Sequence, residues 1–398
     1  MATACAATPR NTHWGVISVV VGSGIITALQ VGKTSIATPI LQSDLNLEFA
    51  AAGWLTGIFA VLGLVGGIPA GSLVVRAGDR RILILGLASI VLGTIIGAIA
   101  PSYSVLLASR VLEGFGFLLV TVAGPAILGR VVSSRQRDLA FALWSCFMPA
   151  GMALAMLVGP LFSDWRMLWW GSAGLAAVAI LAGWAVLPPA LGQRSVAWRR
   201  TISDALHVMT SRRPILLAAC FACYSTIFFA LFSFLPVLLM EDMKVAHSTA
   251  GLLSALASGA NIIGNLGASY LLALGASRSL ILIGAYLIMG LAGVGVFLEV
   301  FGPTPTFLLC LLFSAIGGLI PATLISSAPH SVPSAALAPV AIGLLMQGSN
   351  LGQLIGPAAV GGVIGIYGWA AAAGIVLMAA LMATITTMVT NFNETRIR

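Results

Sequence analysis

Long apolar blocks separated by short polar segments dominate this sequence. Residues 300 to 393 contain no Asp, Glu, Lys or Arg, and further apolar blocks recur from Trp14 onward. A helix needs roughly 20 apolar residues to cross about 30 Å of hydrocarbon, and these blocks are long enough to provide them. The strands of a membrane barrel alternate apolar with polar residues, whereas these blocks are continuously apolar. The pattern therefore predicts an all-α integral membrane protein.

Splitting the blocks at charges, prolines and Gly/Ser clusters predicts twelve transmembrane helices. They start near residues 14, 49, 82, 103, 138, 167, 214, 248, 279, 305, 338 and 369. The first apolar stretch is too long for a cleaved signal and no separate processing site follows it, so we expect it to be retained. A hydrophobic content of 59% and a mean hydropathy of +1.07 agree with helices rather than barrel strands.

The basic residues predict the orientation, because Lys and Arg in short loops are kept on the cytoplasmic side. With the N-terminus inside, all but four of the 19 basic residues lie on the inner side; Arg166 and Lys244 lie outside, and Lys33 and Arg110 lie within spans. We therefore expect both termini in the cytoplasm of a cell with a bacterial-type inner (plasma) membrane. The net charge of +8 needs no nucleic-acid partner, because this bias and anionic lipid headgroups account for it.

The chain also repeats itself. A shift of 198 positions places Gly53 on Gly251, Arg80 on Arg278 and Gly86 on Gly284. We therefore expect two six-helix bundles, residues 1–190 and 214–398. Residues 191–213 between them carry five arginines together with apolar residues at helical spacing, which predicts a cytoplasmic linker with an amphipathic helix on the membrane surface. Transporters whose two halves rock against each other share this plan.

Local motifs in both halves resemble those of the major facilitator superfamily. The segment from Gly71 to Arg81 is similar to the basic loop between helices two and three of that family, although Val75 stands where the family has an acid. Asp79 is the expected substitute, paired with Arg130. Arg110-Val-Leu-Glu113-Gly114-Phe-Gly116 is similar to the family's R-x-x-Q/E-G-x-G signature, and Gly159-Pro160 and Gly356-Pro357 to its glycine-proline motif.

The resemblance implies a twelve-helix transporter fold and conformational gating by motif residues. These are Gly71, Arg76, Gly78, Asp79, Arg80, Arg130, Gly159, Pro160, Gly356 and Pro357. Within the superfamily, residues 110–117, 143–145 and 345–348 are most similar to the cyanate-permease-like branch. Short drug/proton antiporters share the chain length and the glycine-proline fifth span, so both branches remain open.

Three charged residues lie within the expected spans. They are Lys33 on span one and Arg110 and Glu113 on span four. A charge in lipid costs several kcal/mol unless it is paired or faces a wet cavity, so these residues are the candidate chemistry. Lys33 and Arg110 are expected at one depth facing the central path, and Arg110 and Glu113 are three apart and can pair. Their net positive charge favours an anion. Alternatively, Lys33 extends to the outer headgroups, or the Arg110–Glu113 pair only braces the bundle.

The expected substrate site combines charged and amide side chains of both halves. Its members are Gln30, Lys33, Arg110, Tyr224, Asn261, Gln347 and Asn350. The Asn and Gln side chains have an alternative role as bridges between helices. Glu113, the only acid within a span, is the candidate proton-coupling group together with Arg110.

The sequence thus predicts a secondary active transporter rather than an enzyme. It has no nucleotide-binding Gly-rich Lys-Ser/Thr loop and no metal-ligating cluster, so we expect no cofactor and no metal. The predicted activity is rocker-switch transport of a small anionic solute, coupled to protons, by a monomer whose partners are the solute, protons and lipid. A proton-driven drug efflux antiporter is the alternative, and a transporter-like membrane sensor without turnover is the third possibility.

Overall fold

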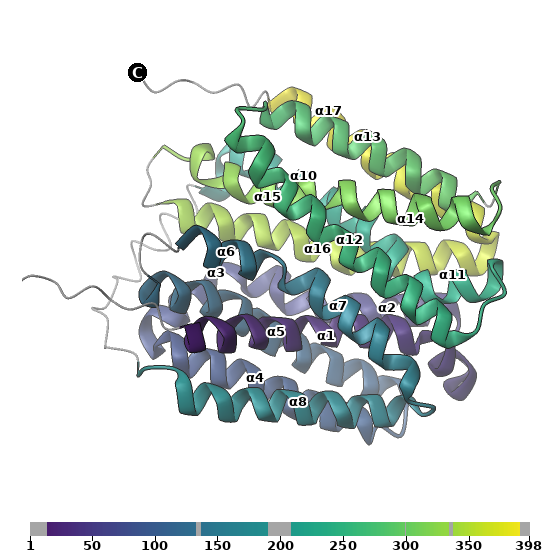
Figure 1. Ribbon diagram of the computed structural model, residues 1–398, viewed down its shortest axis with the longest axis horizontal. Coiled ribbons are helices and arrows are strands. Elements are labelled where there is room, and N and C mark those ends of the chain that lie inside the picture. The colour runs from purple at the N-terminus through teal and green to yellow at the C-terminus, as the bar shows by residue number, and fades with distance from the viewer. Residues whose placement is uncertain (1–13, 133–136, 190–207, 299, 334–336, 391–398) are drawn as a thin grey trace, which may run out of the picture.

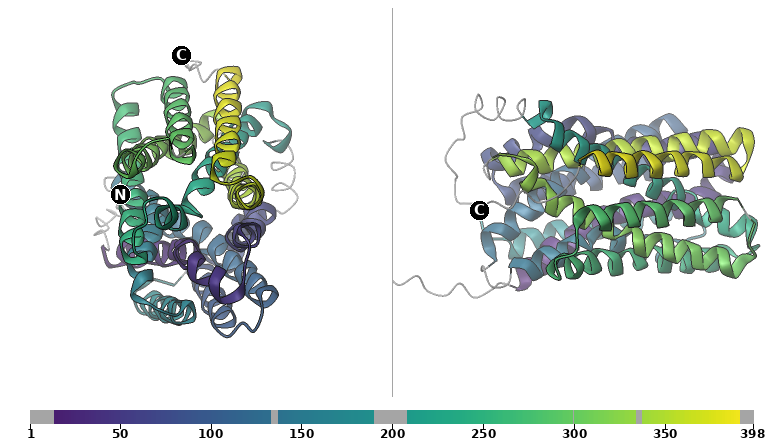
Figure 2. Two further views of the ribbon diagram at one scale, coloured as in Figure 1. Left: turned by 90° about the vertical axis from the view of Figure 1, so that its right-hand side faces the viewer. Right: turned by 90° about the horizontal axis from the view of Figure 1, so that it is seen from above.

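The computed structural model describes residues 14–132, 137–189, 208–298, 300–333 and 337–390 as helices and short connections. Long helices run side by side along the longest axis of the molecule (Figure 1), and the described residues contain no strand. The purple-to-teal helices gather in one part of the molecule and the green-to-yellow helices in the other, as the end-on view in Figure 2 also shows.

The first group comprises the helices up to Val186. They are α1 (Trp14–Leu45), α2 (Phe49–Gly57), η1 (Ile58–Ala60), α3 (Val61–Ala77), α4 (Asp79–Ala98), α5 (Tyr103–Val131), α6 (Arg137–Ser145), α7 (Phe147–Val158), η3 (Gly159–Leu161) and α8 (Trp165–Val186). α1 begins at the end of the bundle where the last described helix, α17 (Ala372–Thr390), ends (Figure 1).

The second group contains the remaining helices. It comprises α10 (Arg212–Phe232), α11 (Leu235–Asp242), α12 (His247–Ala273), α13 (Arg278–Phe297), α14 (Pro303–Gly317), α15 (Leu319–Ser327), η4 (Ala328–Ser331), α16 (Ala338–Tyr367), η6 (Trp369–Ala371) and α17 (Ala372–Thr390). The predicted linker helix lies outside the described residues up to residue 207.

Several of the predicted spans are broken helices. α6 and α7 meet at an angle of 43°. Pro149 lies in the first turn of α7 and has no backbone N–H to bond to the preceding turn, which accounts for the break. In the second span, the 3₁₀ element η1 separates α2 from α3. The chain changes direction at the break between α6 and α7.

The backbone conformation agrees with an internal repeat at two pairs of turns. Asn46 (φ 50°) and Lys244 (φ 53°), 198 positions apart, adopt the left-handed conformation between the first and second spans of their groups. Gly78 (φ 89°) and Gly275 (φ 83°) do so one connection later. Glycine suits this conformation because it has no Cβ to clash with the backbone.

The number of spans that length and composition identify is smaller than predicted. Ten helices among the described residues qualify, or eleven if the bent pair Leu139–Ser145 and Phe147–Leu161 counts as one span. The sequence predicts twelve, and α12 is the span that makes the difference. It has 27 residues but buries serines and asparagines, which lower its hydropathy.

Close backbone approaches join the two groups. α2 and α3 pack against α16, and α7 packs against α12. A Cβ on Gly53 would meet the carbonyl oxygen of Pro357, and a Cβ on Gly251 would lie 2.6 Å from the carbonyl oxygen of Met156 and also against Pro160. Each group therefore places a glycine on the glycine-proline segment of the other, and the two glycines are repeat equivalents.

Candidate functional site

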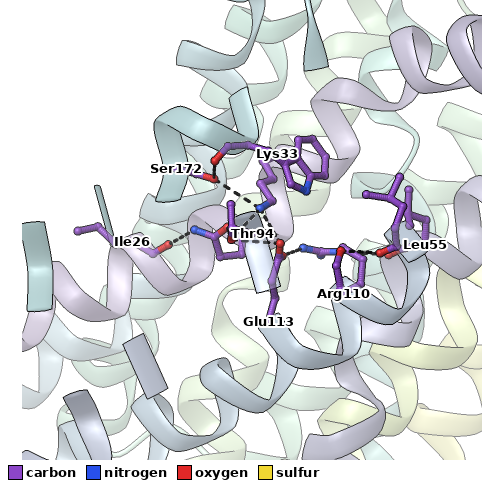
Figure 3. A network of polar contacts seen from close by, with 11 residues as sticks. Ile26, Lys33, Leu55, Thr94, Arg110, Glu113 and Ser172 are labelled. Carbon is purple, nitrogen blue, oxygen red and sulfur yellow. Dashed lines mark hydrogen bonds and ion pairs between the residues drawn. The ribbon is translucent and has the colours of Figure 1, made fainter. Parts of the chain in front are cut away.

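Lys33, Arg110 and Glu113 form one ion triad inside the first helix group (Figure 3). The Nζ atom of Lys33 lies 2.9 Å from Oε1 of Glu113, and Nη1 of Arg110 pairs with Oε2 of the same carboxylate. All three side chains are 0% exposed. Two cations therefore share one carboxylate in a fully buried position, and the triad carries a net charge of one when all three ionise.

Hydroxyl groups from two other helices surround the Lys33 ammonium. Lys33 Nζ lies 3.3 Å from Thr94 Oγ1 on α4 and 3.4 Å from Ser172 Oγ on α8. The same nitrogen lies 4.5 Å from the ring centroid of Trp169, a cation–π distance. Thr94 Oγ1 also lies 3.1 Å from Glu113 Oε1 and 3.4 Å from Gln30 Oε1. The ammonium therefore has three hydrogen-bond partners and an aromatic face.

Arg110 links the triad to the broken second span. Its Nε donates to the carbonyl oxygen of Leu55 at 3.3 Å, and its guanidinium lies 4.6 Å from the ring centroid of Phe59. Its Nη2 atom is buried and has no hydrogen-bond acceptor among the described residues. Buried polar groups are nearly always paired, so this nitrogen is a donor available to a further acceptor.

Glycines on α4 make these contacts possible. A Cβ on Gly93 would lie 2.9 Å from both Cγ and the backbone nitrogen of Glu113, and one on Gly97 would lie 2.7 Å from Trp169 Nε1. Small residues allow membrane helices to approach closely, and here they place Thr94, between the two glycines, against α5. The local sequence of α4 thus positions a hydroxyl on the carboxylate.

The triad contains contacts that the sequence predicts and others that it does not. The pairing of Arg110 with Glu113 is present, as their spacing predicts. Lys33 contacts α4, α5 and α8, so its side chain is directed into its own helix group and does not extend to the headgroups or the second group. Thr94 and Ser172 were missed, because isolated hydroxyl residues in apolar helices give no sequence signal.

The predicted polar residues of the second group bond mainly to one another. Asn261 Nδ2 lies 3.4 Å from Tyr224 Oη and 3.0 Å from the carbonyl oxygen of Ser314, and Asn265 donates to Asn261 Oδ1 at 2.8 Å. These bonds connect α10, α12 and α14. The asparagines therefore bridge helices, which is the alternative role given in the sequence analysis. In the described part of the chain, none of them reaches the triad.

Gln347 and Asn350 on α16 face the second span of the first group. A Cβ on Gly63 would lie 2.6 Å from Cγ of Asn350, and one on Gly67 would lie 3.0 Å from Cγ of Gln347. Both amides therefore lie at the contact between the two groups. They are close to α3 rather than to the triad on α1 and α5.

An ion pair connects α4 and α5 at the predicted inner end. Arg130 Nε and Nη2 donate to the two carboxylate oxygens of Asp79 at 2.8 and 3.0 Å, the pair that the sequence predicts. Gly78, just before Asp79, ends α3 in the left-handed conformation, and Arg80 Nη2 donates to the Trp184 carbonyl at 2.7 Å. Gly71 and Arg76 lie within α3, and the side chain of Arg76 lies outside the described part.

The glycine-proline motifs lie in two different local structures. Gly159 and Pro160 form the 3₁₀ element η3 after α7, whereas Gly356 and Pro357 lie inside α16. A Cβ on Gly356 would lie 2.7 Å from the carbonyl oxygen of Thr226 on α10. Both motifs therefore occur where helices approach closely.

Two groups of long apolar helices, joined by glycine contacts and containing a buried ion triad, define the architecture of a multi-pass membrane protein. Residues 20–340 match the Major Facilitator Superfamily, and the chain belongs to this family of secondary transporters.

The structure has the same fold as two solved transporters. It is similar to the nucleoside transporter NupG with a TM-score of 0.76 and 13% identity, over 95% of this chain and 100% of that one. It is similar to a bacterial homologue of the human lysosomal transporter Spinster, in an inward-facing and occupied conformation, with a TM-score of 0.71 and 17% identity, over 96% of each chain.

Curated relatives include both exporters and symporters. The chain is 28% identical to the multidrug efflux pump LfrA of Mycolicibacterium smegmatis over 48% of this chain and 39% of that one. It is 24% identical to the tetracenomycin C resistance and export protein of Streptomyces glaucescens over 47% and 35%. It is 25% identical to the galactose-proton symporter of Escherichia coli over 48% and 41%. The alignments thus span about two fifths of the length of these relatives, which differ in what they move.

Proposed function

We propose that this protein is a proton-coupled transporter of a small anionic solute, with the Lys33–Arg110–Glu113 triad as its coupling centre. The observation that carries the proposal is that two cations share one carboxylate at 0% exposure. Such a centre is costly to bury, and ionisable residues inside membrane proteins are functional sites by default. A change of one proton alters the buried charge by a full unit, which is what coupling requires.

The surplus positive charge supports an anion as the solute. The triad carries one more positive than negative charge, and Arg110 Nη2 is a buried donor without an acceptor among the described residues. An anion near this nitrogen would neutralise the charge and accept its hydrogen bond. In this proposal Arg110 contacts the solute from the first half, and the other expected contacts are Gln30, Tyr224, Asn261, Gln347 and Asn350.

The proposed movement is a rocking of residues 1–190 against residues 214–398. Its support is the internal repeat and the placement of Gly53 and Gly251 on backbone atoms of the opposite group. Small residues allow helices to separate and close again without a large change in side-chain packing. The motif residues Asp79, Arg130, Pro160 and Pro357 are proposed to gate this movement.

A row of aromatic side chains favours drug efflux as the second candidate function. The ring centroids of Phe59 and Phe117 lie 5.2 Å apart, those of Phe117 and Phe147 6.3 Å, and those of Phe147 and Trp144 4.8 Å. Aromatic surfaces of this kind suit flat lipophilic compounds. Two of the relatives named above are exporters by name, a multidrug efflux pump and a tetracenomycin C export protein.

Two finer assignments belong to the same proposal. The motifs at residues 110–117, 143–145 and 345–348 support membership of the cyanate-permease-like branch. The distribution of basic residues supports residence in a bacterial inner membrane. The first assignment agrees with a small anion as the solute. The purified protein is proposed to act as a monomer.

Proteoliposomes that contain a trapped pH-sensitive dye test the function. Nitrate, cyanate and short carboxylates are added in turn, followed by lipophilic cations, and protein-free liposomes give the background leak. We expect one of the anions to move protons with the wild-type protein and not with Glu113→Gln. Glu48→Gln is the matched control, because Glu48 is exposed and makes no capping bond. Proton movement with lipophilic cations alone would replace anion transport with drug efflux.

A further inference from the structure

We infer that Lys33, rather than Glu113, is the group that binds and releases the transported proton, while Glu113 remains a carboxylate. This inference rests on the proposed function of the triad in proton coupling. It follows from the charges of the three residues, from the atoms around the carboxylate and from the partners that a neutral lysine would have. It differs from the assignment that the sequence suggests, in which the only acid within a span carries the proton.

The charge count separates the two assignments. Arg110 stays protonated in either case, because the guanidinium does not lose its proton in proteins. Protonation of Glu113 would leave the charges of Lys33 and Arg110 together, two positive charges with no counter-charge at 0% exposure. Loss of the Lys33 proton would instead leave the neutral pair of Arg110 and Glu113. Burial penalises net charge, so the triad alternates more readily between one charge and none than between one and two.

The contacts of Glu113 give each carboxylate oxygen a hydrogen-bond donor in both states. Oε1 accepts from Lys33 at 2.9 Å and from Thr94 at 3.1 Å, and Oε2 accepts from Arg110. When Lys33 is neutral, Thr94 and Arg110 still donate to the two oxygens. A carboxylate that keeps a donor on each oxygen favours its charged form.

Neutral Lys33 would also be satisfied where it lies. An amine has two N–H donors and one lone pair, and Nζ has Glu113 Oε1 and two hydroxyl groups within 3.4 Å. The hydroxyl of Ser172, which donates to the Trp169 carbonyl, can rotate to donate to the lone pair instead, because a hydroxyl is both donor and acceptor. The surroundings therefore accommodate the amine as well as the ammonium without movement of a helix.

The charged groups that face Lys33 are few. α5 contributes Glu113 and Arg110, which are the two charged residues that act on it electrostatically. α4 contributes Thr94, α8 contributes Ser172 and Trp169, and α7 packs Met152 and Ala155 against the neighbouring Gly32. Within the described part of the chain, no further acid or base contacts the Lys33 side chain. Burial and the two charged partners thus govern the change in its charge.

This assignment predicts how proton and solute move together. Protonated Lys33 gives the triad one positive charge, which attracts a monovalent anion to the free donor of Arg110. Release of the anion leaves that charge uncompensated and favours release of the proton. One proton and one monovalent anion then cross the membrane in the same step of the cycle.

The chain provides a direct test, because it contains only two lysines, Lys33 and Lys244. Protein made with ¹³C at the lysine ε carbon should give two NMR signals in detergent. Lys244 is exposed on a turn and serves as the internal reference. The variant Lys244→Arg removes the reference signal and so assigns the other one, without a change to the buried triad.

We expect the Lys33 signal to shift as the pH is changed between about pH 5 and about pH 9, and the Lys244 signal to stay constant. A Lys33 signal that keeps the ammonium position throughout that range would overturn the assignment. The dye-loaded liposomes separate this failure from failure of the proposed function. If wild-type protein moves protons with nitrate, cyanate or a carboxylate and Lys33 does not titrate, only the Lys33 assignment is wrong. If wild-type protein moves no protons with any of them, the coupling function is wrong and the transport role of Lys33 is lost with it.

Discussion

Lys33 on α1 reaches Glu113 on α5, with 2.9 Å between Nζ and Oε1, although the two residues are 80 positions apart. The carboxylate also binds Arg110, so it balances one of two cations. The loss of Glu113 therefore has different consequences from the loss of Lys33. Without Glu113, two buried cations remain uncompensated; without Lys33, a neutral pair remains.

This asymmetry predicts the result of a double-mutant cycle with Lys33→Met and Glu113→Gln. Glu113→Gln alone should destabilise the protein by about 3–5 kcal/mol, the usual effect of breaking a buried ion pair from one side. Lys33→Met should cost less, and the double variant should cost less than the sum of the two. Thermal unfolding of the detergent-purified proteins measures these differences, with Glu48→Gln as the exposed control. Strictly additive effects would show that the pair contributes no coupling energy.

The ion pair of Asp79 and Arg130 should contribute less to stability. Both hydrogen bonds are short, but the side chains are 9% and 23% exposed, so solvent weakens the attraction. We expect Asp79→Asn to lower stability by about 1 kcal/mol, near the upper range for exposed pairs. Arg130→Gln should then have a smaller effect in the Asp79→Asn background than in the wild type. The same thermal unfolding assay checks this, and equal effects of Arg130→Gln in both backgrounds would contradict it.

The sequence predicted those features that apolar helices rarely contain. Charged residues and glycine-proline steps are conspicuous in a continuous apolar block, so Lys33, Arg110 and Glu113 were identified and the pairing of Asp79 with Arg130 was expected. The contrast between apolar blocks and charged or glycine-proline positions also predicted where the spans start. α12 has the required length, but its buried serines and asparagines leave it outside the helices that hydropathy alone identifies.

The direction of a side chain was harder to predict. Lys33 was expected to face the central path, and its contacts with Thr94 and Ser172 within its own group were not predicted. Periodicity identifies a polar face but does not say which neighbouring helix covers it when all the neighbours are apolar. Thr94 was missed for the same reason, because its role depends on the approach of α4 to α5 at Gly93.

We expect the addition of a side chain at Gly53 or Gly251 to shift the conformation of the protein. A methyl group at either position would meet backbone atoms of the opposite group, and such overpacking costs about 1–3 kcal/mol. We expect Gly53→Ala and Gly251→Ala each to separate the two groups at the predicted outer end. Spin labels at Glu48→Cys and Ala246→Cys, in a chain whose five cysteines are replaced by alanine, measure that separation by electron–electron double resonance.

The control for these variants is Gly259→Ala, on the same helix as Gly251. A Cβ at Gly259 would have no neighbour within 4 Å, so the distance distribution should remain that of the parent protein. An identical distribution for all three alanine variants would show that the glycine contacts do not hold the outer ends together.

His247 makes a second contact between the groups at the predicted outer end, and it should behave differently from the glycines. Its Nε2 lies 2.9 Å from the carbonyl oxygen of Ile36, so α12 is hydrogen-bonded to α1. One hydrogen bond contributes about 1 kcal/mol net, which corresponds to roughly a fivefold change in the ratio of two conformations. We expect His247→Ala to increase the population with separated Glu48 and Ala246 labels by about this factor, and His247→Gln, which keeps a donor, to increase it less. Equal distance distributions for the wild type and both variants would mean that this hydrogen bond does not bias the equilibrium between the closed and separated outer ends. The glycine contacts alone would then hold the outer ends together.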